Sequence, residues 1–266
     1  MNSDFFAMRK YPRTPHIDGS RLQPGDEDLE RIPFSAIKGK RLVVEEKVDG
    51  ANSAVSFGPD GELLLQSRGH YLRGGYRERH FDLFKRWGTA QSAALRDILG
   101  SRYIMYGEWL YAKHTVFYDA LPHYFLEFDI FDRETRVFLD APTRRELLKD
   151  APVASVPVLA EGTFRTLDEL LKLVGPSRYI TENQRENLQA AAVKLGLDVE
   201  SVFAETELTR MTEGLYVKIE EDGRVVDRMK YVRAAFWQSV FQSESHWIDR
   251  PIVPNQLAVS LESLFE

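Results

Sequence analysis

Lys47 is the residue whose surroundings in the sequence first point to chemistry. It lies in the stretch VVEEKVDGANSAVSF, where apolar residues alternate up to the lysine and resume after Asp49-Gly50. That pattern predicts a strand, a tight turn and a second strand, with Lys47 at the start of the turn. Two glutamates precede the lysine, and Gly50 lets another group approach closely. The arrangement therefore favours a nucleophile over a surface ion pair.

A lone Lys-x-Asp-Gly sequence is weak evidence, because so short a pattern often occurs by chance. In this chain Lys47-Val48-Asp49-Gly50-Ala51-Asn52 is followed, in order, by Ser67-Arg68-Gly69, Tyr106-Gly107-Glu108-Trp109, Phe125-Leu126-Glu127-Phe128-Asp129-Ile130, Glu213-Gly214-Leu215-Tyr216-Val217-Lys218 and Arg228-Met229-Lys230. The interpretation of Lys47 as a nucleophile depends on this whole ordered series.

The ordered series resembles the covalent nucleotidyltransferases, which comprise ATP-dependent polynucleotide ligases and mRNA capping enzymes. The resemblance covers roughly residues 40 to 235. Within that superfamily the chain is most similar to RNA ligases of the T4 RNA ligase 2 type, because of Asn52, the Phe-Asp-Ile strand and the short chain after Lys230. Asp49 departs from that group, which often has histidine there, but aspartate is the commoner residue across the superfamily.

The resemblance implies an ATP-dependent RNA ligase that joins a 3′-hydroxyl to a 5′-phosphate in RNA repair. Lys47 would attack ATP to form lysyl-AMP, the AMP would pass to the RNA 5′-phosphate, and the 3′-hydroxyl would then seal the break. The implied cofactors are ATP and Mg²⁺ or Mn²⁺. The implied partner is RNA with nicked-duplex or broken-loop ends. A separate end-healing kinase or phosphatase would prepare those ends.

The catalytic residues that the resemblance implies are Lys47, Lys230, Arg228 and Glu213. Lys47 can attack phosphorus only as a neutral amine, so desolvation, nearby cations or a metal must lower its pKa. Lys230 and Arg228 alternate on a predicted strand and would bring positive charge to the α-phosphate. Lys230 is the firmer match, because the family usually has lysine where Arg228 stands. Glu213 is the implied metal-facing carboxylate.

Several residues are implied to bind the nucleotide. Glu108 would hold the ribose hydroxyl, Phe125 would offer an aromatic face to adenine, and the backbone around Glu46 would read the adenine edge. Phe125 is also compatible with a plain core position, since Phe128 and Tyr124 are equally good candidates to stack. The expected ATP-binding residues are Glu46, Lys47, Asn52, Arg68, Glu108, Phe125, Lys218 and Lys230.

A basic segment between residues 68 and 86 is a candidate phosphate-binding surface. It carries six cations against two acidic residues and is interleaved with aromatic residues, a composition that suits contact with a phosphate backbone. A solvated helix face is an equally good interpretation. The expected nucleic-acid-binding residues are Asn52, Arg68, Arg73, Arg77 and Arg79.

The elements that must position these residues predict an α+β fold, and the resemblance implies an antiparallel-sheet nucleotidyltransferase domain of the ATP-grasp-like ligase kind. Strands are expected on both sides of Lys47 and over 63–67, as an antiparallel meander, and over 103–110, 124–131, 215–219 and 224–229. Helices are expected within 76–99, over 144–149, 167–174 and 183–195, from about 234, and near 257–265.

Two regions are expected along the chain. Residues 1–237 would form the nucleotidyltransferase domain, with a helical insertion at about 142–205, and residues 238–266 a short helical tail. DNA ligases and capping enzymes carry an OB-fold domain after the last block. Residues 231–266 are too few for one.

Composition limits the alternatives. The 266 residues carry a formal net charge of −6 and no cysteine, which excludes disulfides, thiolate metal sites and binding of nucleic acid through overall charge. No apolar run predicts a signal peptide or a membrane span, so a cytoplasmic protein without a membrane partner is expected. The alternative functions are a capping-type guanylyltransferase, a DNA ligase-like adenylyltransferase and a non-catalytic nucleic-acid-binding module.

Overall fold

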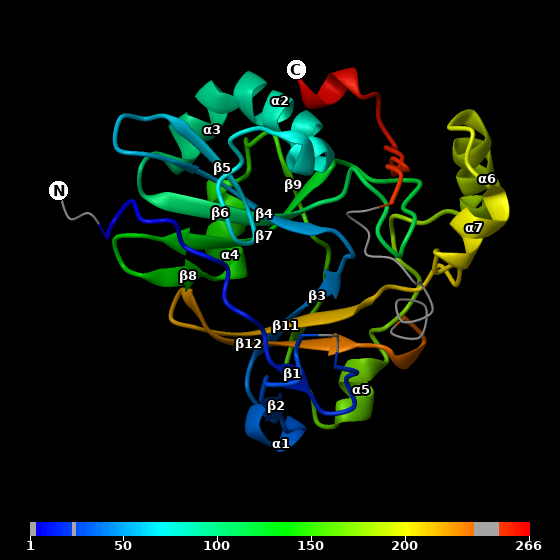
Figure 1. The fold of residues 1–266 in the computed structure, drawn as a ribbon. Helices are drawn as coiled ribbons and strands as arrows, with labels where there is room; N and C mark the ends of the chain where they lie inside the picture. The colour runs from blue at the N-terminus through cyan, green and yellow to red at the C-terminus, as the bar shows by residue number, and fades with distance from the viewer. Residues whose placement is uncertain (1–3, 23–24, 237–249) are drawn as a thin grey trace.

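A twelve-stranded sheet, mostly antiparallel, dominates the computed structural model, which describes residues 4–22, 25–236 and 250–266 (Figure 1). The strands are β1 (His16–Ile17), β2 (Arg31–Ile32), β3 (Leu42–Lys47), β4 (Ala51–Phe57), β5 (Leu63–Ser67), β6 (Tyr103–Trp109), β7 (Phe125–Asp132), β8 (Val137–Leu139), β9 (Ala154–Ser155), β10 (Val158–Gly162), β11 (Gly214–Glu221) and β12 (Arg224–Val232). The main path runs β10-β3-β11-β12-β8-β7-β6-β4-β5. The expected α+β class with an antiparallel sheet is confirmed.

The sheet divides into two halves at the pairing of β12 with β8. Only Arg224 with Leu139 and Val225 with Phe138 are paired there. Strands β3, β11 and β12 form the lower half in Figure 1, and β4, β6 and β7 form the upper half. Two half-sheets joined by so short a ladder leave a space between them for side chains from both.

Helices cover the outer sides of the two half-sheets. They are α1 (Phe34–Ile37), the 3₁₀ helix η1 (Tyr76–Phe81), α2 (Asp82–Ala90), α3 (Ser92–Leu99), α4 (Ala141–Leu147), α5 (Leu167–Leu171), α6 (Gln184–Lys194), α7 (Val199–Ala204) and the 3₁₀ helix η3 (Glu262–Leu264). Figure 1 places α2 and α3 above the upper half-sheet and α1 and α5 below the lower one. Helices α6 and α7 lie together at one side.

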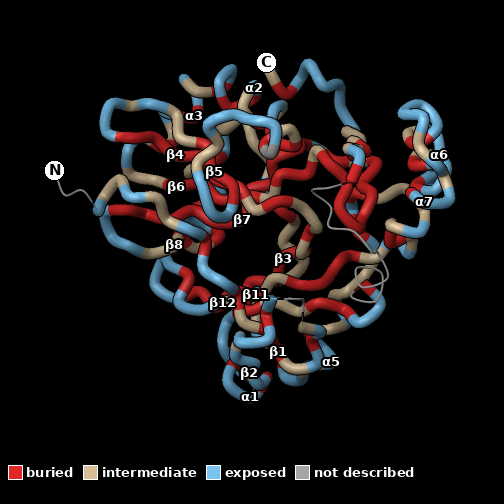
Figure 2. The backbone as a smooth tube through the Cα atoms, in the orientation of Figure 1, coloured by how far each residue is buried: buried red, intermediate tan, exposed pale blue. Residues whose placement is uncertain are grey.

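Each half-sheet has its own apolar core. Trp87 of α2 and Leu99 of α3 belong to the cluster that contains Val55 of the upper half. Ile37 of α1 and Leu170 of α5 belong to a second cluster, built on the lower half. Figure 2 shows the strands of both halves as buried. Because the apolar residues of the outer faces are covered by helices, the space between the halves is available for polar groups.

The expected meander around Lys47 is wrong. Strand β3 lies between β10 and β11, and β4 lies between β6 and β5, so the two strands that flank Lys47 belong to different half-sheets. Alternation of apolar residues identifies strands but not their partners, and the partner of Lys47 in register is Gly214, far along the chain. Only the pairing of β4 with β5 follows the expected meander.

The expected helical insertion at 142–205 is only partly helical. It contains α4 to α7, but also β9 and β10, and β10 pairs antiparallel with β3. The short apolar run around β10 lies next to Pro157, and Pro157 O accepts a hydrogen bond from Glu46 N at 2.9 Å. This segment is therefore built into the sheet beside Lys47.

The C-terminal residues 250–266 are mostly irregular. The expected helix near 257–265 is reduced to the single 3₁₀ turn η3, and Leu264 O accepts a hydrogen bond from Gln91 Nε2 at 3.0 Å. The helix expected from about Ala234 falls largely on residues 237–249, outside the described residues. Within the described chain, no helix has the length and apolar character needed to cross a bilayer.

Candidate active site

Lys47 and Glu213 form an ion pair where β3 ends and β11 begins. Lys47 ends β3, Glu213 precedes β11, and Lys47 Nζ lies 2.7 Å from Glu213 Oε2. Burial alone would lower the pKa of Lys47, but the nearby carboxylates of Glu213 and Glu108 outweigh burial and raise it. The amine is therefore held protonated beside its counterion, which is the opposite of the lowered pKa that attack on phosphorus requires.

Two glycines let the backbone close around this pair. A Cβ on Gly214, opposite Lys47 in the ladder, would lie 1.8 Å from Tyr231 O, and one on Gly50 would lie 2.6 Å from Leu110 Cδ2. Both positions exclude a larger side chain for steric reasons.

Asp49 fixes the turn after Lys47. Its Oδ2 accepts hydrogen bonds from the backbone amides of Thr115, at 2.7 Å, and Val116, at 2.8 Å. The Asp49 amide donates to the Tyr118 hydroxyl at 2.8 Å. These bonds tie the turn to the loop after β6, so the aspartate of Lys-x-Asp-Gly holds Lys47 in place relative to Glu108.

Glu108 and Asn52 face each other across β6 and β4 and carry buried acceptor oxygens without donors. They are direct partners in the ladder, and neither Glu108 Oε2 nor Asn52 Oδ1 has a hydrogen-bond partner among the described residues. Burial raises the pKa of Glu108 to about 8, against the opposing charge of Lys47. Buried acceptors normally have donors, so these two atoms mark a place where a ligand could supply them.

Lys230 brings a second cation to the site. It lies on β12, and its charge lowers the pKa of Glu213 against the larger effect of burial, which raises that pKa to about 7. Its own pKa is lowered, first by burial and then by the charge of Lys47. Lys230 Nζ is bound by the carboxylate of Asp26. The structure therefore brings together Lys47, Glu213, Glu108 and Lys230.

Glu46 is placed differently from the expected adenine-reading position. Its amide is occupied by Pro157 O, and its Oε1 accepts a hydrogen bond from Ser177 Oγ at 2.5 Å. Its side chain is buried, which raises its pKa. The backbone N–H of Glu46 is thus not free to contact a base.

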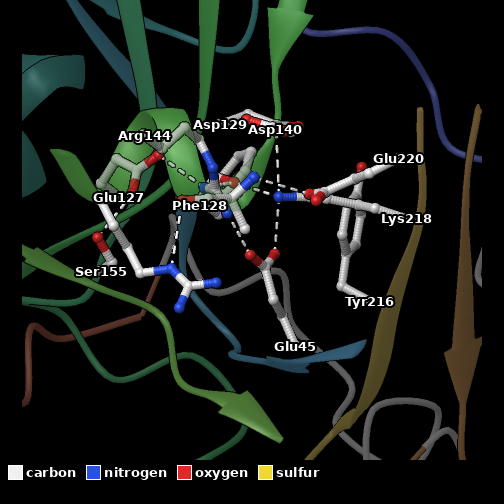
Figure 3. Close-up of polar contacts among 12 residues, drawn as sticks. Glu45, Glu127, Phe128, Asp129, Asp140, Arg144, Ser155, Tyr216, Lys218 and Glu220 are labelled. Carbon is white, nitrogen blue, oxygen red and sulfur yellow. Dashed lines mark hydrogen bonds and ion pairs between the residues drawn. The ribbon is translucent and has the colours of Figure 1, made fainter. Parts of the chain in front are cut away.

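Lys218 and Arg228, both expected at the nucleotide, belong instead to a buried ionic network between the half-sheets. Figure 3 shows Lys218 in this network beside Glu45 and Asp129. Lys218 Nζ lies 2.8 Å from Glu45 Oε2 and 3.1 Å from Asp129 Oδ1, with its side chain fully buried. Arg228 Nη1 lies 3.6 Å from Asp129 Oδ2, and its guanidinium covers the Phe138 ring at 3.8 Å. Neither residue is brought to Lys47.

Arg144 joins the same network from helix α4. Its Nη1 lies 2.7 Å from Glu127 Oε1, and it also binds Glu45. The three cations Lys218, Arg228 and Arg144 thus balance the carboxylates of Glu45, Glu127 and Asp129. Charges this deeply buried are tolerated only when paired and hydrogen-bonded. The network joins β3 and β11 of the lower half-sheet to β7 of the upper half.

Phe125 does not offer an open face. It is fully buried, and its ring is stacked on Phe84 and Trp87 at 5.5 Å each. The aromatic face expected for adenine is therefore part of the core under α2, which matches the alternative interpretation of this residue.

The basic segment 68–86 is partly engaged within the protein. Lys85 Nζ pairs with Asp82 at 2.8 Å, and the buried carboxylate of Glu78 accepts a hydrogen bond from Gly74 N at 2.7 Å. Arg68, Arg73 and Arg86 are exposed, and Arg79 lies over the Tyr76 ring at 4.9 Å. The Arg77 side chain is not among the side chains that the structure describes. Arg68 also lowers the pKa of Glu108, although burial and other charges act more strongly.

Sequence reasoning missed the network residues Glu45, Glu127, Asp129 and Arg144 and the Lys230 partner Asp26. Their signal was present in part. Glu45, Glu127 and Asp129 interrupt otherwise apolar strands, where an unpaired charge is costly. Asp26 lies in an irregular segment rich in charge, where no sequence pattern identifies a long-range partner.

Glu213 and Glu108 are the carboxylates of the site that could contribute to holding a divalent cation. The described residues contain no group of three or more histidine, cysteine, aspartate or glutamate side chains arranged to bind a metal ion. Glu213 and Glu108 are nevertheless two carboxylates close enough to influence each other's charge. Hard divalent cations that keep waters and bind phosphates commonly need only one or two such carboxylates, so the residues fit a cation bound together with a nucleotide.

Comparisons with known proteins concern the family and the fold of the chain. The RNA ligase family model matches residues 40–232. Two solved structures with a similar fold are variants of Naegleria gruberi RNA ligase with ATP and Mn. A glutamate-to-alanine variant has a TM-score of 0.54 and 18% identity, covering 87% of this chain and 58% of that chain. A lysine-to-alanine variant has a TM-score of 0.53 and 16% identity, covering 90% and 59%.

At that identity the likeness shows the fold alone, and this chain spans less than two thirds of those chains. The comparison with curated proteins gives no match. The similarity to the family and to the solved structures therefore rests on the fold and on the matched region 40–232.

Proposed function

The chain belongs to the RNA ligase family, and from that premise we propose that it joins RNA ends in an ATP-dependent reaction. The observation that carries the proposal is the Lys47–Glu213 pair beside Glu108 and Lys230, because this set supplies a nucleophile, a proton acceptor and a cation for phosphate. The matched ligases with ATP and Mn support ATP and Mg²⁺ or Mn²⁺ as cofactors.

The first step is attack of Lys47 Nζ on the α-phosphorus of ATP. An N–P bond forms, the bond to pyrophosphate breaks, and the amine must lose a proton. Glu213 Oε2 is 2.7 Å from Nζ, and burial raises the pKa of Glu213 to about 7. A carboxylate with a pKa near the working pH is well suited to accept this proton.

Lys230 and the acceptor pair hold the nucleotide in this proposal. Lys230 contributes positive charge to the phosphates. Glu108 Oε2 and Asn52 Oδ1, both without donors, accept hydrogen bonds from the ribose hydroxyls. While Glu213 is ionised, before it accepts the Lys47 proton, a divalent cation held by it would supply further positive charge against the phosphate oxygens and would lower the pKa of Lys47.

The later steps transfer AMP to an RNA 5′-phosphate and then release it when a 3′-hydroxyl attacks. Arg68 and Arg73 are exposed, and Arg68 lies close enough to Glu108 to lower its pKa. Both would contact the RNA backbone, with Arg77 and Arg79 of the same segment. We also propose that residues 1–237 act as one nucleotidyltransferase unit, and that the reaction serves RNA repair.

Label transfer from α-labelled ATP tests the proposal. Wild-type protein should become labelled, Lys47→Ala should not, and Lys40→Ala, which removes an exposed lysine near the start of the same strand, should label normally. Sealing of nicked duplex RNA, nicked DNA and single-stranded RNA should then be compared in parallel. Labelling by GTP in preference to ATP, or full sealing by Lys47→Ala, would contradict the ligase assignment.

A further inference from the structure

The segment before the family match, described over residues 11–22 and 25–32, packs against the strand that carries Lys230. His16 of β1 pairs with Lys230 of β12 in parallel register. Lys230 N donates to Pro15 O at 2.9 Å, and Arg21 N donates to Val232 O at 3.0 Å. This segment is thus fixed to β12 by backbone bonds on both sides of the Lys230 side chain.

Side chains of this segment form a closed chain of hydrogen bonds that begins and ends on β12. Val232 N donates to Ser20 Oγ at 2.9 Å, and Ser20 Oγ lies 2.6 Å from His16 Nδ1. His16 Nε2 lies 3.1 Å from Asp26 Oδ2, and the same oxygen binds Lys230 Nζ.

The donors and acceptors in this chain fix the histidine tautomer. The ionised Asp26 carboxylate can only accept a hydrogen bond from His16 Nε2, which leaves His16 Nδ1 as the acceptor of the Ser20 hydroxyl hydrogen. His16 Nε2 then carries the ring hydrogen and donates it to Asp26. Burial lowers the pKa of His16, so the ring is neutral. A neutral ring in this orientation fixes the Asp26 carboxylate without neutralising its charge.

Asp26 is the counterion of Lys230. The charged and polar groups that act on Lys230 are Asp26, Lys47, Glu213 and His16. Of these, Lys47 repels the Lys230 ammonium, and Asp26 is the one in direct contact with it. The side chains of Lys230 and Asp26 are only 11% and 10% exposed, so water screens the attraction between their charges little.

We propose that Asp26, oriented by His16 and Ser20, is a positioning residue that holds Lys230 where its charge reaches the phosphates of the nucleotide. The inference rests on the proposed function, and it assigns a role in the site to residues outside the matched region 40–232. The need for a separate counterion follows from the chemistry. Lys47 must give up its proton while Lys230 must keep its own, so one shared carboxylate could not serve both lysines.

Single-turnover formation of lysyl-AMP from labelled ATP tests this role. Asp26→Asn preserves shape but removes the charge, and we expect it to slow the step by roughly 10- to 100-fold, as expected when a catalytic group is misplaced. Asp26→Glu should recover part of the rate. Glu30→Gln should match wild type, because Glu30 is an exposed carboxylate of the same segment; Asp28 is unsuitable as the control, since its partner Arg13 also pairs with Asp26. Equal melting temperatures would show that each variant folds.

Two further measurements separate positioning from a merely structural role. In a Lys230→Ala background, Asp26→Asn should add no further loss, because the residue acts through Lys230. The alkaline limb of the pH–rate profile of Asp26→Asn should lie at lower pH than that of wild type, since Lys230 without its counterion loses its proton sooner. Wild-type rate in Asp26→Asn, or fully additive losses in the double variant, would overturn the inference. A wild-type protein that ATP does not label would instead refute the proposed function.

Discussion

Replacing Arg144 by methionine should destabilise the fold strongly, because it breaks the buried ionic network without leaving a large cavity. Arg144 is 4% exposed and is bound to Glu45 and Glu127, both fully buried. Removing one partner of a buried ion pair typically costs about 3–5 kcal/mol, since the remaining charge has no counterion. For a chain of this size that corresponds to a fall in melting temperature of roughly 10 °C.

Arg145 provides a matched control on the same helix. Its side chain is 58% exposed and pairs with Glu161 in solvent, so Arg145→Met should change the free energy of unfolding by less than about 0.5 kcal/mol. Urea unfolding followed by circular dichroism measures both variants. A loss below about 1 kcal/mol for Arg144→Met at pH 8 would show that the network does not hold the half-sheets together.

The effect of Arg144→Met should also depend on pH. Burial already raises the pKa of Glu127, and Arg144 opposes that rise, so the variant should raise it further. When the pKa of a carboxyl group is raised in the folded state, the free energy of unfolding of the protein falls as pH rises through that pKa, because the folded state must give up a proton that it binds more tightly than the unfolded state does. The difference between wild type and variant should therefore be largest near pH 8 and shrink towards pH 5. A difference that grows on acidification would refute this electrostatic explanation.

Two further predictions concern residues expected to bind ATP. Phe125→Leu should lower the free energy of unfolding by roughly 1–2 kcal/mol through lost packing against Phe84 and Trp87. The ATP concentration that gives half-maximal label transfer should not change. A tenfold rise in that concentration at wild-type stability would place the ring at the adenine instead. Burial raises the pKa of Glu108 to about 8, so Glu108→Gln resembles the protonated wild type at pH 7. The labelling rate of this variant should be within a few-fold of the wild-type rate at pH 7 and should diverge from it only above about pH 8, whereas Glu108→Leu should be defective at every pH. Equal defects in both variants at pH 7 would contradict the raised pKa.

Much of the fold followed from local patterns in the sequence. Alternation around Val55 located β4, and the strands expected over 215–219 and 224–229 lie within β11 and β12. The same patterns could not identify partners. Lys47 lies opposite Gly214 because β11 inserts beside β3, and this depends on the packing of the whole sheet rather than on any stretch near Lys47.

The sequence could not show which side chains contact one another across the two half-sheets, and this limited prediction of the site. Lys47, Glu213, Glu108 and Lys230 were expected together because they lie in recurring blocks, and the structure places their side chains near one another. Lys218 lies in such a block too, yet its side chain points into Glu45 and Asp129. A lysine that binds a phosphate and one that neutralises buried carboxylates have the same letter in the sequence, and only their neighbours in space distinguish them.

The position of β3 has a consequence for synthesis of the chain. Its two neighbours are β10 and β11, so the hydrogen-bonding groups on both edges of β3 have no permanent partners until residues 158–221 have been made. Because chains are synthesised at about 5–20 residues per second, β3 stays unpaired for several seconds or more while the later strands are made on the ribosome. An apolar strand with two open edges readily joins the wrong partner. Expression of this protein should therefore be sensitive to chaperones and to translation speed, and Lys47 can reach its place beside Glu213 only after β11 has been made.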